Sequence, residues 1–175
     1  MTVWNIDKAH TNVGFTVKHM MVSKVRGKFN DFEGTIKGDP TDLTNCEIEF
    51  KINVDSIDTS NEDRDNHLRS ADFFDVENYP EMTFTSTKIV QTDDDEYEIT
   101  GDLTMKGVTK EVTLEAEFEG KGVNPWGQEV VGFSVEGKVN RKDFGLTWNQ
   151  TLETGGVLVS ETIKIVIELE ANPAQ

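Results

Sequence analysis

Apolar and polar residues alternate along most of this chain, and this alternation limits the possible fold more than any other sequence feature. From Cys46 to Asp55 every second residue is apolar, and the residues between them are polar. The same alternation recurs at 96–106 and at 111–119. A period of two places alternate side chains on opposite faces of a β-strand. Each of these segments is therefore expected to be a strand with one dry face and one wet face.

Further candidate strands extend this pattern over most of the chain. Turn-forming Gly, Asp, Asn and Pro residues separate most of them. With the three segments above, they bring the expectation to about eight or nine strands. The additional segments, some of them short, lie at 13–19, 25–36, 82–90, 133–139, 146–152 and 163–169.

One stretch, from Thr59 to Asp75, lacks the alternation. It begins with polar residues of the kind that cap helices. We expect a short helical insertion around residues 60–72, followed by a loop. Leu68, Phe73 and Phe74 are the apolar side chains that would press this insertion onto the strands, at one end of the sheet.

Many antiparallel strands with one polar face each can hide their dry faces in two ways. Two sheets can pack against each other, or one sheet can roll up and close. The all-β barrel is the preferred prediction, because closure removes exposed strand edges and because these strands are long for an immunoglobulin-like sandwich. A barrel of about eight strands has an interior that is either filled by side chains or able to hold one small ligand.

The charge of the chain excludes some classes of partner. The formal net charge is -16 and the pI is about 4.5. Binding to nucleic acid depends on Lys and Arg side chains that displace condensed counterions. Nucleic acid and anionic membrane surfaces are therefore not expected partners, and the acidic residues are interpreted as a solvated outer face.

The cysteine count and the N-terminal residues bear on the compartment. Cys46 is the single cysteine, so an intramolecular disulfide is impossible. The first residues contain neither a basic region nor an apolar core typical of a secretory signal. No run approaches the roughly 20 apolar residues of a membrane span. These features predict a cytoplasmic protein with no transmembrane segment.

Catalytic and metal-binding patterns are missing from the sequence. His10, His19 and His67 stand on separate segments without zinc-ligand spacing. No G-x-S-x-G motif occurs, and Cys46 lies on an inward strand face without an evident base. Most carboxylates fall on the outward register, where solvated carboxylates make poor acid-base catalysts. We therefore expect no enzyme activity, no cofactor and no metal site.

The inward register leaves two possibilities for the barrel interior. Most inward residues are large and apolar, but Gly101, Ala116 and Gly137 are small and leave volume inside. A solid-cored structural or protein-interaction module is the alternative to a ligand-binding barrel. His19 also falls on the inward register, where it is either a hydrogen-bonded core residue or a polar anchor for an apolar ligand.

Several of these segments together resemble the YceI-like family of lipocalin-like bacterial proteins. The resemblance covers nearly the whole chain and implies one YceI-like β-barrel domain at 1–175. It implies an eight-stranded antiparallel lipocalin-like barrel with a helical insertion, and a tendency to form a homodimer. The residues that carry it are DKAHTNVGF at 7–15, VKHM at 17–20, GKF at 27–29, FEG at 32–34, HLRSADFFD at 67–75, YP at 79–80, GDLTMKGVT at 101–109 and NRKDFG at 140–145.

The resemblance also implies an internal tunnel that holds a polyisoprenoid, an isoprenoid quinone or a fatty-acid-like lipid. The expected function is that of a lipid carrier or storage protein. His19 and Arg141 are the candidates for contact with a polar head group, the latter because guanidinium suits phosphate geometry. The residues expected to line the tunnel are Phe15, Val17, Phe50, Ile52, Phe84, Leu103, Met105, Leu114, Phe133, Val135 and Phe144.

Overall fold

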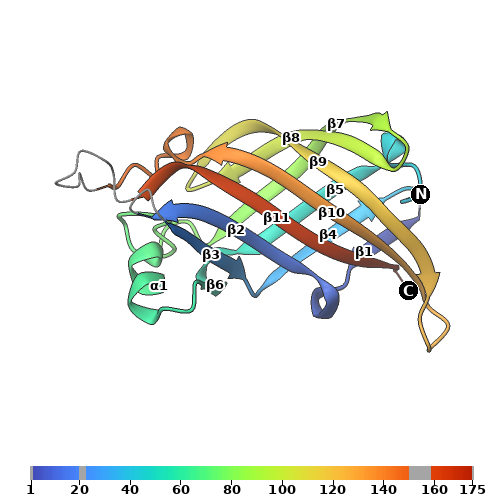
Figure 1. Cartoon of the computed structure of the whole chain (residues 1–175), viewed down its shortest axis with the longest axis horizontal. Coiled ribbons are helices and arrows are strands. Elements are labelled where there is room, and N and C mark those ends of the chain that lie inside the picture. The colour runs from blue at the N-terminus through green and yellow to red at the C-terminus, as the bar shows by residue number, and fades with distance from the viewer. Residues whose placement is uncertain (1, 20–22, 150–158, 175) are drawn as a thin grey trace.

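The structure, a computed structural model, describes residues 2–19, 23–149 and 159–174. It is built almost entirely from antiparallel strands, with the helix α1 at Glu62–Arg69 (Figure 1). Short 3-10 turns lie at Lys8–His10, Leu43–Asn45, Val54–Ser56 and Arg141–Phe144. The strands are β1 (Val3–Ile6), β2 (Asn12–His19), β3 (Ser23–Phe29), β4 (Phe32–Lys37), β5 (Glu47–Asn53), β6 (Ile57–Asp58), β7 (Glu81–Asp93), β8 (Glu96–Met105), β9 (Val108–Val123), β10 (Glu129–Asn140) and β11 (Val159–Pro173).

The strands close into a barrel because the last strand pairs with the first two. β11 pairs with β2 through registers such as Ile165 with Phe15, and with β1 through Trp4 with Pro173. β1 and β2 form one interrupted barrel strand, as do β3 with β4 and β5 with β6, which gives a closed eight-stranded antiparallel barrel. The prediction of a barrel, in place of two packed sheets, is confirmed.

The alternation predicted the two faces of the long strands correctly. On β8, Tyr97, Ile99, Leu103 and Met105 are buried, whereas the residues between them are exposed or partly exposed. Burial of these apolar faces contributes roughly 25 cal/mol for each Å² removed from water. The polar residues on the other register lie on the outer surface. Each strand therefore places its apolar side chains in the interior and its polar side chains in solvent.

Two of the expected strands differ from the prediction. The segment at 25–36 is two strands, because the chain breaks at Asn30 and Asp31, whose backbone groups bond to the turn that follows β5. In the segment at 146–152, Leu146 to Asn149 is not a strand, and the remainder lies outside the described residues. Its carbonyl groups at Leu146 and Trp148 accept hydrogen bonds from the Arg141 side chain, so a sheet ladder does not use them.

The helical insertion is confirmed and lies at the end of the barrel away from the chain termini (Figure 1). Asn61 caps α1 by accepting a hydrogen bond from the backbone N–H of Arg64, as capping residues do. Asp65 is buried and accepts from both the backbone and the hydroxyl of Thr59, which ties the helix to the chain just after β6. Among helices in the described residues, none is long and apolar enough to cross a membrane.

The opposite end of the barrel is closed by a tightly buried cluster. Leu43 and Val131 are 1% and 0% exposed, and Trp4 and Ala171 are buried beside them. Cys46 belongs to this cluster, and its thiol donates to the backbone carbonyl of Asp39 at 3.1 Å. Burial, together with the nearby carboxylates of Asp39 and Asp42, raises the pKa of Cys46 to about 11.

This environment predicts an unreactive thiol. Because the thiolate is the reacting form, Cys46 at pH 8 should react with a disulfide reagent such as DTNB more than about tenfold slower than in the urea-unfolded chain. Stopped-flow absorbance of the folded and unfolded protein measures both rates. Equal rates would contradict the burial of the thiol at this end of the barrel.

Candidate functional site

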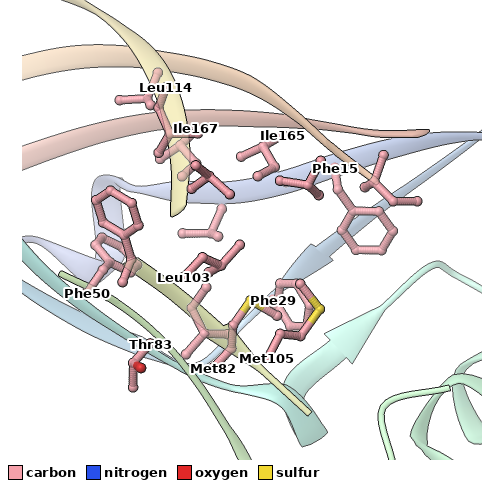
Figure 2. A pocket seen from close by; sticks show the side chains of 18 of the residues that line it. Phe15, Phe29, Phe50, Met82, Thr83, Leu103, Met105, Leu114, Ile165 and Ile167 are labelled. Carbon is pink, nitrogen blue, oxygen red and sulfur yellow. The ribbon is translucent and has the colours of Figure 1, made fainter. Parts of the chain in front are cut away.

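The barrel encloses a cavity whose wall is almost wholly apolar. Its volume is about 200 Å³, which far exceeds the ~10–15 Å³ that a single water molecule needs. Among the described residues that form the wall, only Thr83 and Arg141 have polar side chains. Figure 2 shows Phe and Met side chains together with Leu and Ile side chains converging on this space from several strands. Such a cavity offers apolar contacts to a ligand and little else.

The cavity lies between two separate parts of the hydrophobic core. One cluster of buried residues fills the end near Trp4 and Leu43, and the other lies at the α1 end around Phe73 and Phe144. The side chains that contact both clusters are only partly buried. They are Ile6, Phe84, Ile165 and Ile167.

The structure brings ten of the eleven expected tunnel residues to the cavity wall. Phe144 is different, because it is 2% exposed and packs in the cluster at the α1 end without lining the cavity. Its position follows a strand, in the 3-10 turn at Arg141–Phe144, where strand alternation no longer indicates the direction of a side chain. The ten that line the wall are Phe15, Val17, Phe50, Ile52, Phe84, Leu103, Met105, Leu114, Phe133 and Val135.

Other wall residues were not singled out from the sequence. Ile163, Ile165 and Ile167 on β11 line the cavity, and their alternation was a signal that could have identified them. Leu68 and Phe74 line it from the helical insertion. No strand period covers the insertion, so sequence reasoning placed these side chains only against one end of the sheet.

Arg141 is buried at the α1 end of the cavity and is held by backbone carbonyl groups. Its Nη1 donates to the carbonyls of Leu146 at 2.6 Å and Trp148 at 2.9 Å. Its Nε donates to Ser160 at 2.9 Å and its Nη2 to Val159 at 3.3 Å. The guanidinium thus joins the start of β11 to the segment that follows the 3-10 turn.

The charge of Arg141 lacks a close acidic partner within the described residues. Glu161 acts on it at longer range and bonds to Lys142 at 2.7 Å. Burial lowers the pKa of Arg141, and the charge of Glu161 opposes that shift. The side chain nevertheless keeps its charge at neutral pH, because a guanidinium is too basic to lose its proton there. A positive charge balanced mainly by carbonyl dipoles therefore lies at one end of an apolar cavity.

The second head-group candidate, His19, ends β2, and its side chain lies outside the described part of the structure. Its backbone pairs with Val159, whose carbonyl accepts a hydrogen bond from Arg141. The register therefore brings both candidates to the same end of the barrel. The contact of either residue with a ligand stays a prediction.

One group of metal-ligating side chains was not anticipated from the sequence. Ligand atoms of Asp7, His10 and Glu170 lie within 4.8 Å of one another at the surface. The Nδ1 of His10 lies 2.8 Å from the Asp7 carboxylate, and this hydrogen bond raises the pKa of His10. The Asp7 backbone N–H also donates to the Glu170 carbonyl, so the group lies on the seam where the barrel closes.

Comparison with known proteins places this chain in a family. The sequence profile of the YceI-like domain matches residues 4–171. The chain belongs to the YceI-like family. A UPF0312 protein of Staphylococcus epidermidis is 46% identical over 171 residues, which cover 97% of each chain. A UPF0312 protein of Staphylococcus aureus is 40% identical over the same share of both chains.

Solved structures of other proteins share the barrel. The Campylobacter jejuni YceI protein has a TM-score of 0.78 at 40% identity, covering 97% of this chain and 96% of its own. Burkholderia cenocepacia BcnA has a TM-score of 0.82 at 25% identity, covering 94% and 98%. A polyisoprenoid-binding domain from Saccharophagus degradans has a TM-score of 0.72 at 14% identity, covering 98% of both chains, and this likeness shows the fold alone.

The contacts of Arg141 predict that Lys cannot replace it. Arg141→Lys keeps the charge but cannot donate in four directions, and so leaves buried carbonyls without donors. We expect the free energy of unfolding to fall by about 2–4 kcal/mol, measured by urea denaturation. Arg26→Lys, on the exposed face of β3, is the matched control and should change it by less than ~0.5 kcal/mol. Equal stability of the two variants would contradict the role assigned to Arg141.

Proposed function

We propose that this YceI-like protein binds one long apolar amphiphile in its internal cavity, as a lipid carrier or storage protein. The observation that carries the proposal is the nearly all-apolar wall around an enclosed space. Polyisoprenoids, isoprenoid quinones and fatty-acid-like lipids share the long apolar chain that such a wall accepts. The name of the Saccharophagus degradans domain, which has the same fold, supports a polyisoprenoid as one member of this class.

The energetics of burial are sufficient for such a ligand. Each buried methylene contributes about 0.8 kcal/mol, so a chain of roughly twenty carbons would contribute ~16 kcal/mol before costs if it were buried along its whole length. Ordering the chain and losing its free motion cost several kcal/mol or more. The balance corresponds to micromolar or tighter affinity. Since the wall supplies few polar contacts, we expect the cavity to select ligands by length and girth.

We further propose that the polar head lies at the α1 end, near Arg141 and His19. The buried charge of Arg141, bonded mainly to carbonyls, favours an anionic head such as a carboxylate or phosphate. Palmitate and hexadecanol offer equal chains with different heads and separate this contribution. We expect tighter binding of palmitate in a fluorescence displacement assay at pH 8. Equal affinity would contradict a charged contact at this end.

The alternative of a solid-cored module is less well supported, because the cavity separates the two clusters of the core. An enzyme acting on the lipid would need a nucleophile or an acid-base pair at the wall, and the polar wall residues of the described chain are Thr83 and Arg141. We propose that residues 1–175 act as one domain, since the first and last strands pair. The homodimer stays a prediction that sedimentation velocity checks.

Filling the cavity should abolish binding while the barrel stays folded. Leu103 and Phe133 line the wall from β8 and β10, so Leu103→Trp and Phe133→Trp place an indole inside it. We expect each to lower the affinity for a fluorescent long-chain fatty acid by more than about tenfold. Circular dichroism checks that each variant is folded.

The matched control is Glu98→Trp, which places the same residue on the outward face of β8. This variant should bind the fatty acid as the unchanged protein does. Folded Leu103→Trp and Phe133→Trp variants that still bind with full affinity would show that the ligand lies elsewhere.

A further inference from the structure

We propose that glycines on β3, β4, β8 and β10 set the width of the cavity, and thereby admit a methyl-branched chain. Each of these glycines is called a seat, because it leaves space in which a large side chain of the wall lies. The inference rests on the proposed function and deepens it, because it names the residues that decide ligand girth. In each case a large apolar side chain of the wall lies over a glycine of the neighbouring strand. The four pairs are Phe15 with Gly27, Phe50 with Gly34, Phe84 with Gly101 and Leu114 with Gly137.

Two of these pairs are directly opposite residues in the sheet. Phe15 on β2 is opposite Gly27 on β3, and Phe50 on β5 is opposite Gly34 on β4. A Cβ atom added at Gly27 would lie 2.3 Å from the Phe15 ring, and one added at Gly34 would lie 2.6 Å from the Phe50 ring. Both rings therefore occupy the space that any other residue's Cβ would fill.

The other two pairs repeat this arrangement on the remaining part of the barrel. A Cβ at Gly137 on β10 would lie 2.4 Å from a terminal methyl of Leu114 on β9. A Cβ at Gly101 on β8 would lie 2.6 Å from the Phe84 ring, and also 2.4 Å from the carbonyl oxygen of Thr85. Gly101 therefore allows the close approach of the Thr85 backbone as well as of the Phe84 ring. A Cβ at Gly137 would instead meet mainly the flexible Leu114 side chain.

The seats keep these four side chains against the wall. Figure 2 shows Phe15 and Phe50 on different sides of the cavity, with Leu114 at a third position. An ordinary contact of about 3.5 Å would require each seated side chain to move by roughly 1 Å. Neighbouring strands occupy the space behind the wall, so the displaced side chain would enter the cavity. If larger residues replaced the four glycines, the cavity would be narrower at four positions around its wall.

Width distinguishes branched from straight chains of equal length. Geranylgeraniol carries methyl branches along its chain, and hexadecanol has the same main-chain length without them. A narrower cavity excludes the branched chain before the straight one, because a close-packed interior does not accommodate extra methyl groups. The seats therefore leave room for the methyl branches of such a chain.

Alanine at two of the seats tests this inference. Gly137→Ala and Gly34→Ala should weaken geranylgeraniol binding by about tenfold and hexadecanol binding by less than about threefold, measured by fluorescence displacement. Gly132→Ala, also on β10, is the matched control, since its Cβ would lie 3.7 Å from the nearest side-chain atom. The control should leave both affinities unchanged.

A second-site variant guards against a folding defect. Leu114→Val shortens the side chain that the new Cβ meets at Gly137, so Gly137→Ala with Leu114→Val should regain most geranylgeraniol binding. Unchanged discrimination between the two alcohols in folded Gly137→Ala and Gly34→Ala would overturn the proposal. So would a double variant that stays as weak as Gly137→Ala alone.

Xenon uptake separates this inference from the proposed function, because an apolar cavity binds xenon without any lipid. Crystals of the unchanged protein under xenon pressure should show occupancy in the cavity, and Gly137→Ala crystals should show clearly less. If neither the two alcohols nor palmitate bind the unchanged protein, the proposed function fails. The xenon comparison then still decides whether the glycines set the width, and equal occupancy would reject it.

Discussion

Pairing of β11 with β1 and β2 is the constraint on which the rest of this structure depends. Backbone hydrogen bonds along this seam convert a twisted sheet into a ring, so no strand edge is left along it. A ring of eight strands has a fixed diameter, and its inward side chains must share whatever space that diameter encloses. Closure therefore creates both the protected interior and the question of what fills it.

The interior is divided between dense packing and open space. At the termini end, Trp4 and Val131 are buried in a cluster and do not line the cavity. Between this cluster and the α1 end, side chains lie along the wall and leave the cavity. Hydrophobic burial holds the barrel together at its ends, and unfilled apolar surface in the middle is a source of binding free energy. Some core residues serve both purposes, because Leu103 and Phe133 are buried members of the two clusters and also line the cavity.

Sequence alternation predicted the barrel and most of the cavity wall because a strand's two faces follow directly from its period. Ile99, Leu103 and Met105 on β8 are examples in which every inward position is buried. Outside the strands, alternation does not predict which way a side chain points. Phe144 and Leu146 sit in or beside a 3-10 turn, and their direction depends on long-range packing.

Arg141 illustrates a second limit of sequence reasoning. Its type indicated an anion-binding side chain, but its carbonyl partners come from segments that only the folded barrel brings together. The cavity width that the glycines set could not be predicted from the sequence either. Gly101 and Gly137 indicated spare volume inside, whereas the structure shows neighbouring side chains occupying that volume and leaving space in the centre. The types of the inward residues indicate how much side-chain volume the barrel contains. The pairing register of the strands decides where in the barrel that volume lies.

Native mass spectrometry of protein freshly purified without detergent tests the central claim most directly. If the cavity holds a long apolar molecule in the cell, each folded chain should carry an added mass, and solvent extraction should release a long-chain lipid that accounts for it. Chains that carry no added mass, and that bind no long-chain lipid when one is supplied, would contradict the claim.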